Sequence, residues 1–484
     1  MTELHYQSAT RLCALIRARK IGCLELLDHY LKRVERHNGM VNAVVWMDKR
    51  GARKRAKLAD AALARGESWG PLHGLPMTVK EAYDLAGSPS THGVPALRDN
   101  IATTDSVVVA RLKAAGAVIF GKTNLPFAMA DWQTFNAIYG TTRNPWNTDR
   151  VPGGSSGGSA AALAAGLTGA EAGSDIGSSI RNPAHYTGTF GLKPTWGIVS
   201  QRGHAPRGWI EQPDVAVVGP MARSAADLEL LLDVMSGPDA LEADAWKLAL
   251  AKPRIRTLKG LRIALKLGDA NVAVDREYAD VLQNLADRLA KAGAKVSDEA
   301  APKVDTTRQH ELYLTLYRAA LSAGSDTDIA NWRAALKTPL GQTNVRMLNG
   351  MLQGNTLSHK QWLQMDNERQ HLRLRYAEFF EGWDLILCPA AAGPAWPHDH
   401  EGERWMRKIE VNGQKVPVTD QLFWSGLSGV VHLPSTVGPA GFSESGLPLG
   451  YQAIAGFGRD RTALHFSRLV EREFGGFVAP PGYD

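Results

Sequence analysis

Residues 151–200 constrain the possible fold more than any other part of this sequence. The segment is rich in glycine, serine and alanine, and after Arg150 it contains only one lysine and one arginine. It opens with GGSSGGS at 153–159, followed directly by the alanine-rich run AAALAAG. Glycine permits tight turns and a close approach of the backbone to other groups. This segment is therefore the part of the chain least like an ordinary protein surface, and the first place to expect a functional loop.

The GGSSGGS loop allows two interpretations. Gly153, Ser155 and Gly157 fit the G-x-S-x-G pattern of a nucleophile elbow, in which Ser155 would attack and a downstream acid and histidine would complete the site. No histidine lies near the loop in the sequence. The chain has no G-x-x-x-x-G-K-[ST] motif, so the glycines do not form a Walker phosphate loop. The alternative is that the loop supports a reacting group located elsewhere in the chain.

A second serine cluster, GSDIGSSIRNPA at 173–184, is more informative. Consecutive N–H groups around Gly177, Ser178 and Ser179 can converge on one point, as an oxyanion hole requires. Ser179 would then be a nucleophile whose transition state is stabilised beside it. The alternative is a tight turn in which Ser178 and Ser179 bond to their own backbone, and the local residues favour that turn.

A serine nucleophile needs a base, and a buried lysine can serve because desolvation lowers its pKa and leaves it neutral. The stretch GLPMTVKEAYDLAG at 74–87 alternates in the period-two pattern of a strand, which would end near Lys80. The alternative is an ordinary strand-end lysine that pairs with Glu81 or Asp84.

Together these motifs resemble the amidase signature family, serine hydrolases that use a Ser–cis-Ser–Lys triad. Ser155 and Lys80 precede Ser179 by 24 and 99 residues, the separations that family members show. The likeness continues through residues 121–147, 190–200, 218–228, 384–390 and 447–456. The resemblance implies that Ser179 is the nucleophile, Ser155 the bridging serine in a cis peptide, and Lys80 the base.

The resemblance also implies an oxyanion hole and a substrate pocket. The N–H groups of Ile176, Gly177 and Ser178 would hold the oxyanion, with Ser179 as a further candidate. Apolar side chains would line a cleft for aryl or alkyl groups, although each of them could equally be ordinary packing. The candidates for the cleft are Met129, Ala130, Trp132, Phe135, Trp209 and Trp424.

The implied fold is an α/β/α sandwich around a mixed β-sheet, formed by a single domain over 1–484. Its parts are a helical lead-in at 1–65, a catalytic core at 70–230 and a helical insertion at 300–382 that shapes the substrate cleft. Hydrophobic periodicity predicts the elements directly. Helices are expected at 8–18, 23–36, 51–65, 103–115, 275–293, 307–337, 358–382 and 460–474, and strands at 75–80, 118–122, 260–269, 294–300 and 384–390.

Three residues depart from the family pattern. Ser178 stands where glycine is frequent, and Glu171 stands where a small residue is usual. Cys388 lies in an apolar strand and raises a rival nucleophile of the nitrilase type, although a cysteine in such a strand is more often inert core. We expect none of the three to affect the triad.

The composition of the chain excludes several classes of binding partner. The net charge is +6, but the densest basic run, residues 49–57, has helical spacing with alanines on one face, which indicates a solvated helix surface and not a nucleic-acid site. Three scattered cysteines indicate a reducing compartment. No stretch is apolar enough for a signal peptide or a membrane span. No metal-binding spacing occurs. We therefore expect a cytoplasmic monomer or homodimer that needs no metal or cofactor.

The predicted function is hydrolysis of C–N bonds in small molecules. By the resemblance, the substrates would be aryl or alkyl amides, anilides, carbamates (urethanes) or esters. The alternative is a glutaminase-type subunit of a tRNA-dependent amidotransferase, which would need partner chains and ATP.

Overall fold

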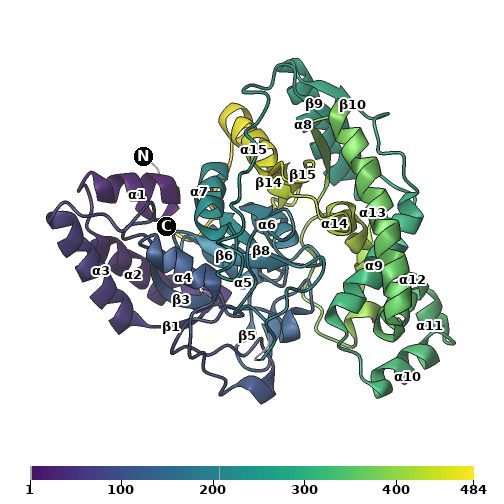
Figure 1. The fold of residues 1–484 in the computed structure, drawn as a ribbon, viewed down its shortest axis with the longest axis horizontal. Coiled ribbons are helices and arrows are strands. Elements are labelled where there is room, and N and C mark those ends of the chain that lie inside the picture. Colours follow the sequence, from purple (N-terminus) through teal and green to yellow (C-terminus); the bar gives the residue numbers. More distant parts are fainter. Residues whose placement is uncertain (1–2, 206–207) are drawn as a thin grey trace.

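The computed structural model describes residues 3–205 and 208–484 and shows β-sheet in the centre with helices on both sides (Figure 1). Within the described residues, the main sheet contains eight strands: β6 (Glu171–Asp175), β7 (Phe190–Lys193), β8 (Val217–Ala222), β9 (Arg262–Leu265), β10 (Lys295–Ser297), β11 (Leu385–Pro389), β14 (Ser435–Phe442) and β15 (Pro448–Ile454). Their order is β10-β9-β11-β15-β14-β7-β8-β6. Strands β10, β9 and β11 run parallel to one another, and every other pair of neighbouring strands is antiparallel. The sheet is therefore mixed, as predicted.

Helices cover both faces of this sheet. Thr436 and Val437 are neighbours in β14, so their side chains point to opposite faces. Val437 packs with Ala184 of α6 (Arg181–Thr187), whereas Thr436 Oγ1 donates to the Ala463 carbonyl of α15 (Asp460–Phe474). Helices α6 and α15 therefore lie on opposite sides, and the predicted sandwich is confirmed.

A smaller sheet carries the predicted lysine strand. It contains β1 (Val44–Met47), β2 (Pro76–Lys80) and β3 (Val118–Thr123) in the order β1-β3-β2. Strand β2 lies beside the chain that leads into β6, because Gly169 N–H donates to the Pro76 carbonyl and Thr78 N–H donates to Thr168 Oγ1. Strand β1 was not predicted. It lies inside the expected helical lead-in and pairs antiparallel with β3.

The first half also contains the helices α1 (Ala9–Arg17), α2 (Cys23–Val41), α3 (Lys49–Ala64), α4 (Val107–Ala114), α5 (Gly157–Ala164) and α7 (Ala225–Met235). Four of them, α1 to α4, agree with the predicted periodicity, whereas α5 and α7 were not predicted. Helix α3 buries four alanines on one face and exposes most of its basic residues. Its basic run is therefore a solvated helix surface, as expected.

The Gly, Ser and Ala segment is the most completely buried part of the molecule. Every residue from 151 to 195 is buried except Ile176. Small side chains let this segment pack closely against its neighbours. A Cβ added at Gly158 would lie 2.4 Å from Asn124 N, and one added at Gly154 would lie 2.4 Å from the Asp131 carbonyl oxygen.

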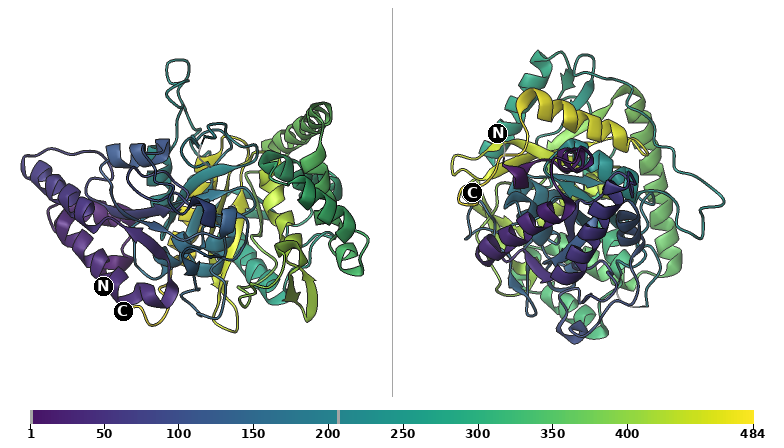
Figure 2. Two further views of the ribbon diagram at one scale, coloured as in Figure 1. Left: turned by 90° about the horizontal axis from the view of Figure 1, so that it is seen from below. Right: turned by 90° about the vertical axis from the view of Figure 1, so that its left-hand side faces the viewer.

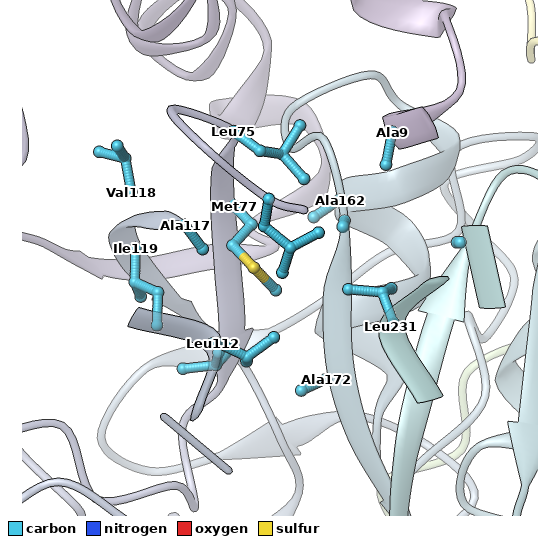
Figure 3. Packing of buried hydrophobic residues seen from close by; sticks show 14 of the residues in the cluster. Ala9, Leu75, Met77, Leu112, Ala117, Val118, Ile119, Ala162, Ala172 and Leu231 are labelled. Carbon is cyan, nitrogen blue, oxygen red and sulfur yellow. The ribbon is translucent and has the colours of Figure 1, made fainter. Parts of the chain in front are cut away.

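The largest apolar cluster joins the two sheets. Figure 3 shows Leu75, Met77 and Leu112 gathered with Ala162 and Leu231, all of them members of that cluster. On the other side of β2, Thr78 and Lys80 make polar contacts. The predicted alternation of this strand is thus confirmed.

The second half contains α8 (Arg276–Lys291), which connects the parallel strands β9 and β10 as predicted, and α14 (Leu422–Gly429). The insertion comprises α9 (Thr306–Leu321), α10 (Asp326–Ala335), α11 (Pro339–Gln342), α12 (Val345–Thr356) and α13 (His359–Gly382). Two short hairpins contain the strands β4 (Phe135–Asn136), β5 (Gly140–Thr141), β12 (Lys408–Val411) and β13 (Gln414–Pro417).

The prediction of a single helix at 307–337 is wrong, because two helices, α9 and α10, occupy this range. Ser322 takes a left-handed conformation (φ 37°) and ends α9, and Ser325 starts α10 with a capping box to Asp328. Helix α12 was also missed. Figure 2 shows the N-terminal helices and the insertion helices at opposite ends of the molecule, with the sheets between them.

Candidate active site

Lys80 ends β2 with a completely buried side chain. Its Nζ lies 2.6 Å from Ser155 Oγ, 2.9 Å from Ser174 Oγ and 3.1 Å from Ser156 Oγ. Glu81, which the sequence offered as an alternative partner, instead accepts hydrogen bonds from backbone N–H groups at 91 and 92. The polar surroundings of Lys80 are therefore mainly hydroxyl groups.

Burial controls the protonation of Lys80. Removal from water lowers the pKa of Lys80 to about 7, although Asp175 and Glu171 favour its charged form. A lysine with this pKa is neutral in a large fraction of molecules near pH 7. A neutral amine can accept a proton from the Ser155 hydroxyl.

The GGSSGGS loop holds Ser155 against the lysine. The peptide bond between Gly154 and Ser155 is cis, the form that the family resemblance implies. Asn182 fixes this peptide from both sides, since its Oδ1 accepts from Gly154 N–H and its Nδ2 donates to the Gly154 carbonyl. Gly153 has a φ of 84°, and a Cβ there would lie 2.5 Å from Asn182 Oδ1. Glycine is therefore required at 153.

The two serine clusters meet at the backbone. Ser156 N–H donates to the Ser179 carbonyl at 3.1 Å, and both serines are buried. Within the described residues no hydrogen bond joins the side chains of Ser155 and Ser179. The structure thus brings Lys80 and Ser155 into direct contact and places Ser179 beside them through the backbone.

Asp175 organises the turn that precedes Ser179. Its carboxylate accepts from the N–H groups of Ser178 and Ile180 and forms a fully buried ion pair with Arg181, 2.8 Å from Oδ1 to Nη2. Ser178 has a left-handed φ of 75°, which explains why glycine is frequent in the family there. The sequence analysis did not predict a role for Asp175. Its position six residues before Arg181, in a segment with very few charged residues, could have indicated such an ion pair.

The predicted oxyanion donors need one correction. Ser178 N–H already donates to Asp175 Oδ1 at 2.9 Å, so it points at this carboxylate and not at a substrate. In the described part of the chain, the N–H groups of Ile176, Gly177 and Ser179 donate no hydrogen bond. These three groups are therefore available to an oxyanion, and Ser178 is not.

Several predicted cleft residues lie near this turn. Trp132 Nε1 donates to the Gly177 carbonyl at 2.7 Å. Ala130 and Phe135 line a cavity of about 420 Å³, and Met129, partly exposed, is adjacent in the chain. Trp424 is completely buried in α14 and lines no described cavity.

Trp209, the remaining predicted cleft residue, lines a different cavity from Ala130 and Phe135. Its side chain is 64% exposed and lines a different surface pocket, together with Thr103, Arg202 and Pro238. None of Lys80, Ser155 and Ser179 lines that pocket.

Comparison with known proteins shows the family of this chain. The family model named Amidase matches residues 25–464. The chain is 34% identical to an indoleacetamide hydrolase of Bradyrhizobium diazoefficiens, covering 97% of this chain and 86% of the relative. This chain belongs to the amidase family. The amidase is also 31% identical to an acylamidase of Rhodococcus erythropolis, with 97% of each chain covered. A solved bacterial aryl acylamidase shares its fold, with a TM-score of 0.81, 24% identity, and coverage of 98% of this chain and 97% of that one.

Membership of this family makes the protein an enzyme that hydrolyses C–N bonds of amides, acting on small molecules. No helix in the described residues is long and apolar enough to cross a bilayer. Among the same residues, no group of three or more His, Cys, Asp or Glu side chains is placed to hold a metal ion.

Cys388 does not compete as the nucleophile of this amidase. Its side chain is completely buried in β11, and burial raises the pKa of the Cys388 thiol to about 12. Gln452 Nε2 contacts its sulfur at 3.3 Å. Because the thiolate is the reactive form, a thiol with this pKa is inert at neutral pH.

Glu171 occupies the position where a small residue is usual. Its side chain is completely buried, Thr78 Oγ1 donates to its Oε1, and its Oε2 has no hydrogen-bond partner in the described residues. Burial raises the pKa of Glu171 to about 8. At pH 7 it is therefore mostly a neutral carboxylic acid.

This protonation state predicts a pH-dependent stability. The folded chain keeps a proton on Glu171 that the unfolded chain releases above a pKa of about 4.3, so folding binds this proton between pH 5 and 8. Stability from this group is then lost as pH rises. The free energy of unfolding of the natural protein should therefore fall with pH, whereas the Glu171→Gln variant lacks this group. The difference, variant minus natural protein, should grow by about 1.4 kcal/mol per pH unit between pH 5.5 and 7.5. Urea unfolding at three pH values measures this difference, and a pH-independent difference would contradict it.

Proposed function

We propose that this amidase hydrolyses its substrates through an acyl-enzyme on Ser179. The observation that carries the proposal is the completely buried Lys80, whose Nζ lies 2.6 Å from Ser155 Oγ. Neutral Lys80 accepts the proton of Ser155, Ser155 accepts that of Ser179, and the Ser179 oxygen attacks the carbonyl carbon. The proton then returns through Ser155 to the leaving amine. Water attacks the acyl-enzyme and releases the acid.

The oxyanion of the tetrahedral intermediate would be held by the N–H groups of Ile176, Gly177 and Ser179. Their freedom from other hydrogen bonds supports this role, and the Asp175 carboxylate keeps the turn in place beneath them. Fixed donors of this kind need no reorganisation when charge develops. Ile176, the partly exposed residue of the buried segment, marks where the turn meets the cleft.

The substrates that we propose are aryl or alkyl amides and anilides, together with carbamates (urethanes) and esters. The names of the two relatives, an indoleacetamide hydrolase and an acylamidase, support amides with an apolar or aromatic part. The cavity and the small hollow beside it support the same class, because Phe135 and residues of α9, α10 and α12 line the cavity and Trp132 lines the hollow. The insertion at 300–382 therefore shapes this cleft.

A substrate panel tests the function directly. The purified chain, with its Ser179→Ala variant as the blank, should hydrolyse acyl nitroanilides, short amides or aryl carbamates without ATP. The alternative, a glutaminase subunit of an amidotransferase, is less favoured by the named relatives and predicts activity on glutamine only with partner chains and ATP. Absence of ATP-independent hydrolysis across the panel would overturn the proposal.

The pH profile tests the base. Only neutral Lys80 can accept a proton, and its fraction grows as pH rises through its pKa of about 7. The value of kcat/KM should therefore rise about tenfold per pH unit below pH 6 and level off above pH 8. Steady-state kinetics between pH 5 and 9 measure this profile. A rate that stays flat or falls over this range would rule out a lysine base.

We also infer that the enzyme works in the cytoplasm as a monomer or homodimer. Its three cysteines are free and buried, which suits a reducing compartment. Light scattering on the purified chain measures the oligomeric state.

A further inference from the structure

The cavity beside the serine turn carries an unusual set of charges. It has a volume of about 420 Å³, and three arginines and three acidic residues line it. One pair is satisfied internally, because Arg407 Nη1 donates to Asp131 Oδ2. The remaining lining charges are Arg318, Arg404, Asp328 and Glu403.

The two remaining acids favour the charged form of the two remaining arginines but form no ion pair with them in the described residues. Asp328 accepts hydrogen bonds from the N–H and the hydroxyl of Ser325 at the start of α10, at 2.9 and 2.7 Å. Glu403 is exposed. In the described residues, neither Arg318 nor Arg404 has a carboxylate within 4 Å.

Arg318 is the more costly of the two cations to leave unpaired. Only 8% of the residue is exposed, and its Nε has no hydrogen-bond partner in the described part of the chain. Its guanidinium stacks on Trp332, 5.6 Å from the ring centre. A buried charge without a counter-ion is strongly unfavourable, so a site of this kind favours an incoming anion.

Arg318 and Arg404 both interact with the hydroxyl group of Tyr317. Burial raises the pKa of Tyr317, but Arg404 and Arg318, which also hydrogen-bond to its side chain, together bring that pKa below its usual value. Burial, and to a smaller extent Arg404, lowers the pKa of Arg318. Because both arginines line the same cavity, one small anion bound there can contact both guanidinium groups, as a carboxylate with two oxygens allows.

This cationic pair lies within reach of the reaction centre. A Cβ placed on Gly177 would lie 3.7 Å from Tyr317 Cε2 and 3.2 Å from Leu422 Cδ2. Arg404, Trp132 and Leu422 together line a small hollow next to the larger cavity. Tyr317, which precedes Arg318 in α9, and Leu422, which lines the hollow together with Arg404, thus both lie against the serine turn.

We propose that Arg318 and Arg404 bind a carboxylate at the far end of the substrate's acyl chain, so that the preferred substrates are monoamides of dicarboxylic acids. The inference rests on the proposed acyl-enzyme function. The aromatic and aliphatic walls hold the methylene chain, and the arginine pair holds its terminal carboxylate. Tyr317 positions both guanidinium groups.

Two anilides of equal chain length test this specificity. Glutaryl 4-nitroanilide carries the carboxylate, and pentanoyl 4-nitroanilide replaces it with a methyl group. A charge-assisted hydrogen bond typically changes affinity by about 10- to 150-fold, so the enzyme should prefer the glutaryl compound by at least about tenfold in kcat/KM. Arg318→Gln and Arg404→Gln should each remove most of this preference, mainly through KM. The control Arg333→Gln, an exposed residue of α10, should keep it.

The outcomes separate this inference from the proposed function. Equal or better hydrolysis of pentanoyl 4-nitroanilide by the natural enzyme would overturn the carboxylate site while leaving the amidase mechanism intact. If both arginine variants keep the preference for glutaryl 4-nitroanilide, the carboxylate site is likewise overturned and the amidase mechanism stays intact. If neither anilide is cleaved, calorimetry on the Ser179→Ala protein still decides: glutaryl 4-nitroanilide should bind at least about tenfold more tightly than the pentanoyl compound, and equal binding overturns the site.

Discussion

Replacing Ser179 with alanine should lower kcat/KM for amide substrates by at least about 10⁴-fold. Removing the nucleophile of a serine hydrolase eliminates the covalent pathway, and losses of about 10⁶-fold in kcat are known for such changes. The fold should persist, because the Ser179 carbonyl, which accepts from Ser156 N–H, is unchanged. Hydrolysis of an acyl nitroanilide, followed by absorbance, measures the loss.

The neighbouring serine provides the matched control. Ser178 Oγ is buried without a hydrogen-bond partner in the described residues, and the residue has a left-handed backbone. Ser178→Gly removes the hydroxyl, keeps the N–H that donates to Asp175, and relieves the positive φ. Its activity should stay within about tenfold of the natural enzyme. A comparable loss in both variants would refute the assignment of Ser179.

Replacing Asp175 with asparagine should lower the free energy of unfolding by about 3–5 kcal/mol. The change leaves the completely buried Arg181 without a counter-ion, and its remaining partners, including Ser428 and Gln452, are neutral. It also weakens the hydrogen bonds that hold the turn before Ser179. Urea denaturation at pH 7, followed by circular dichroism, measures the difference.

Two further variants give this prediction its control. Arg202 and Asp239 form an ion pair whose arginine is half exposed, so Asp239→Asn should cost less than about 1 kcal/mol. The double variant Asp175→Asn with Arg181→Met removes both charges and should be less destabilised than the sum of its single changes. An Asp175→Asn protein within 1 kcal/mol of the natural one would contradict the role of the ion pair.

Local sequence patterns predicted the elements that carry the site. Alternation located β2 within one residue, because one face of this strand packs in the core and the other meets polar groups. The break after Leu321 was missed because apolar periodicity continues across a short polar turn. Only the left-handed Ser322 and the capping box at Ser325 end one helix and begin the next.

The residues around the triad were predicted less evenly. The two serine clusters were recognisable from their glycines, but the roles of Lys80, Ser155 and Ser179 came from the family resemblance and stay a prediction. Of the predicted oxyanion donors, Ser178 N–H is already bonded, because Asp175 accepts from it in a turn that spacing alone does not define. Trp209 lines a different cavity from Ala130 and Phe135, and aromatic character alone could not tell these cavities apart.

The sequence by itself determined the family, the mixed α/β class and the two serine loops, since these depend on short motifs and on periodicities within single elements. Only the tertiary structure decided which groups meet. It put Lys80 among three hydroxyls, 75 to 94 residues away in the chain, and buried Asp175 against Arg181. It also left Arg318 and Arg404 without an ion pair among the described residues, although acids line the same cavity. The pKa of a lysine and the pairing of an arginine depend on burial and on distant neighbours, and these are fixed only when the chain is folded.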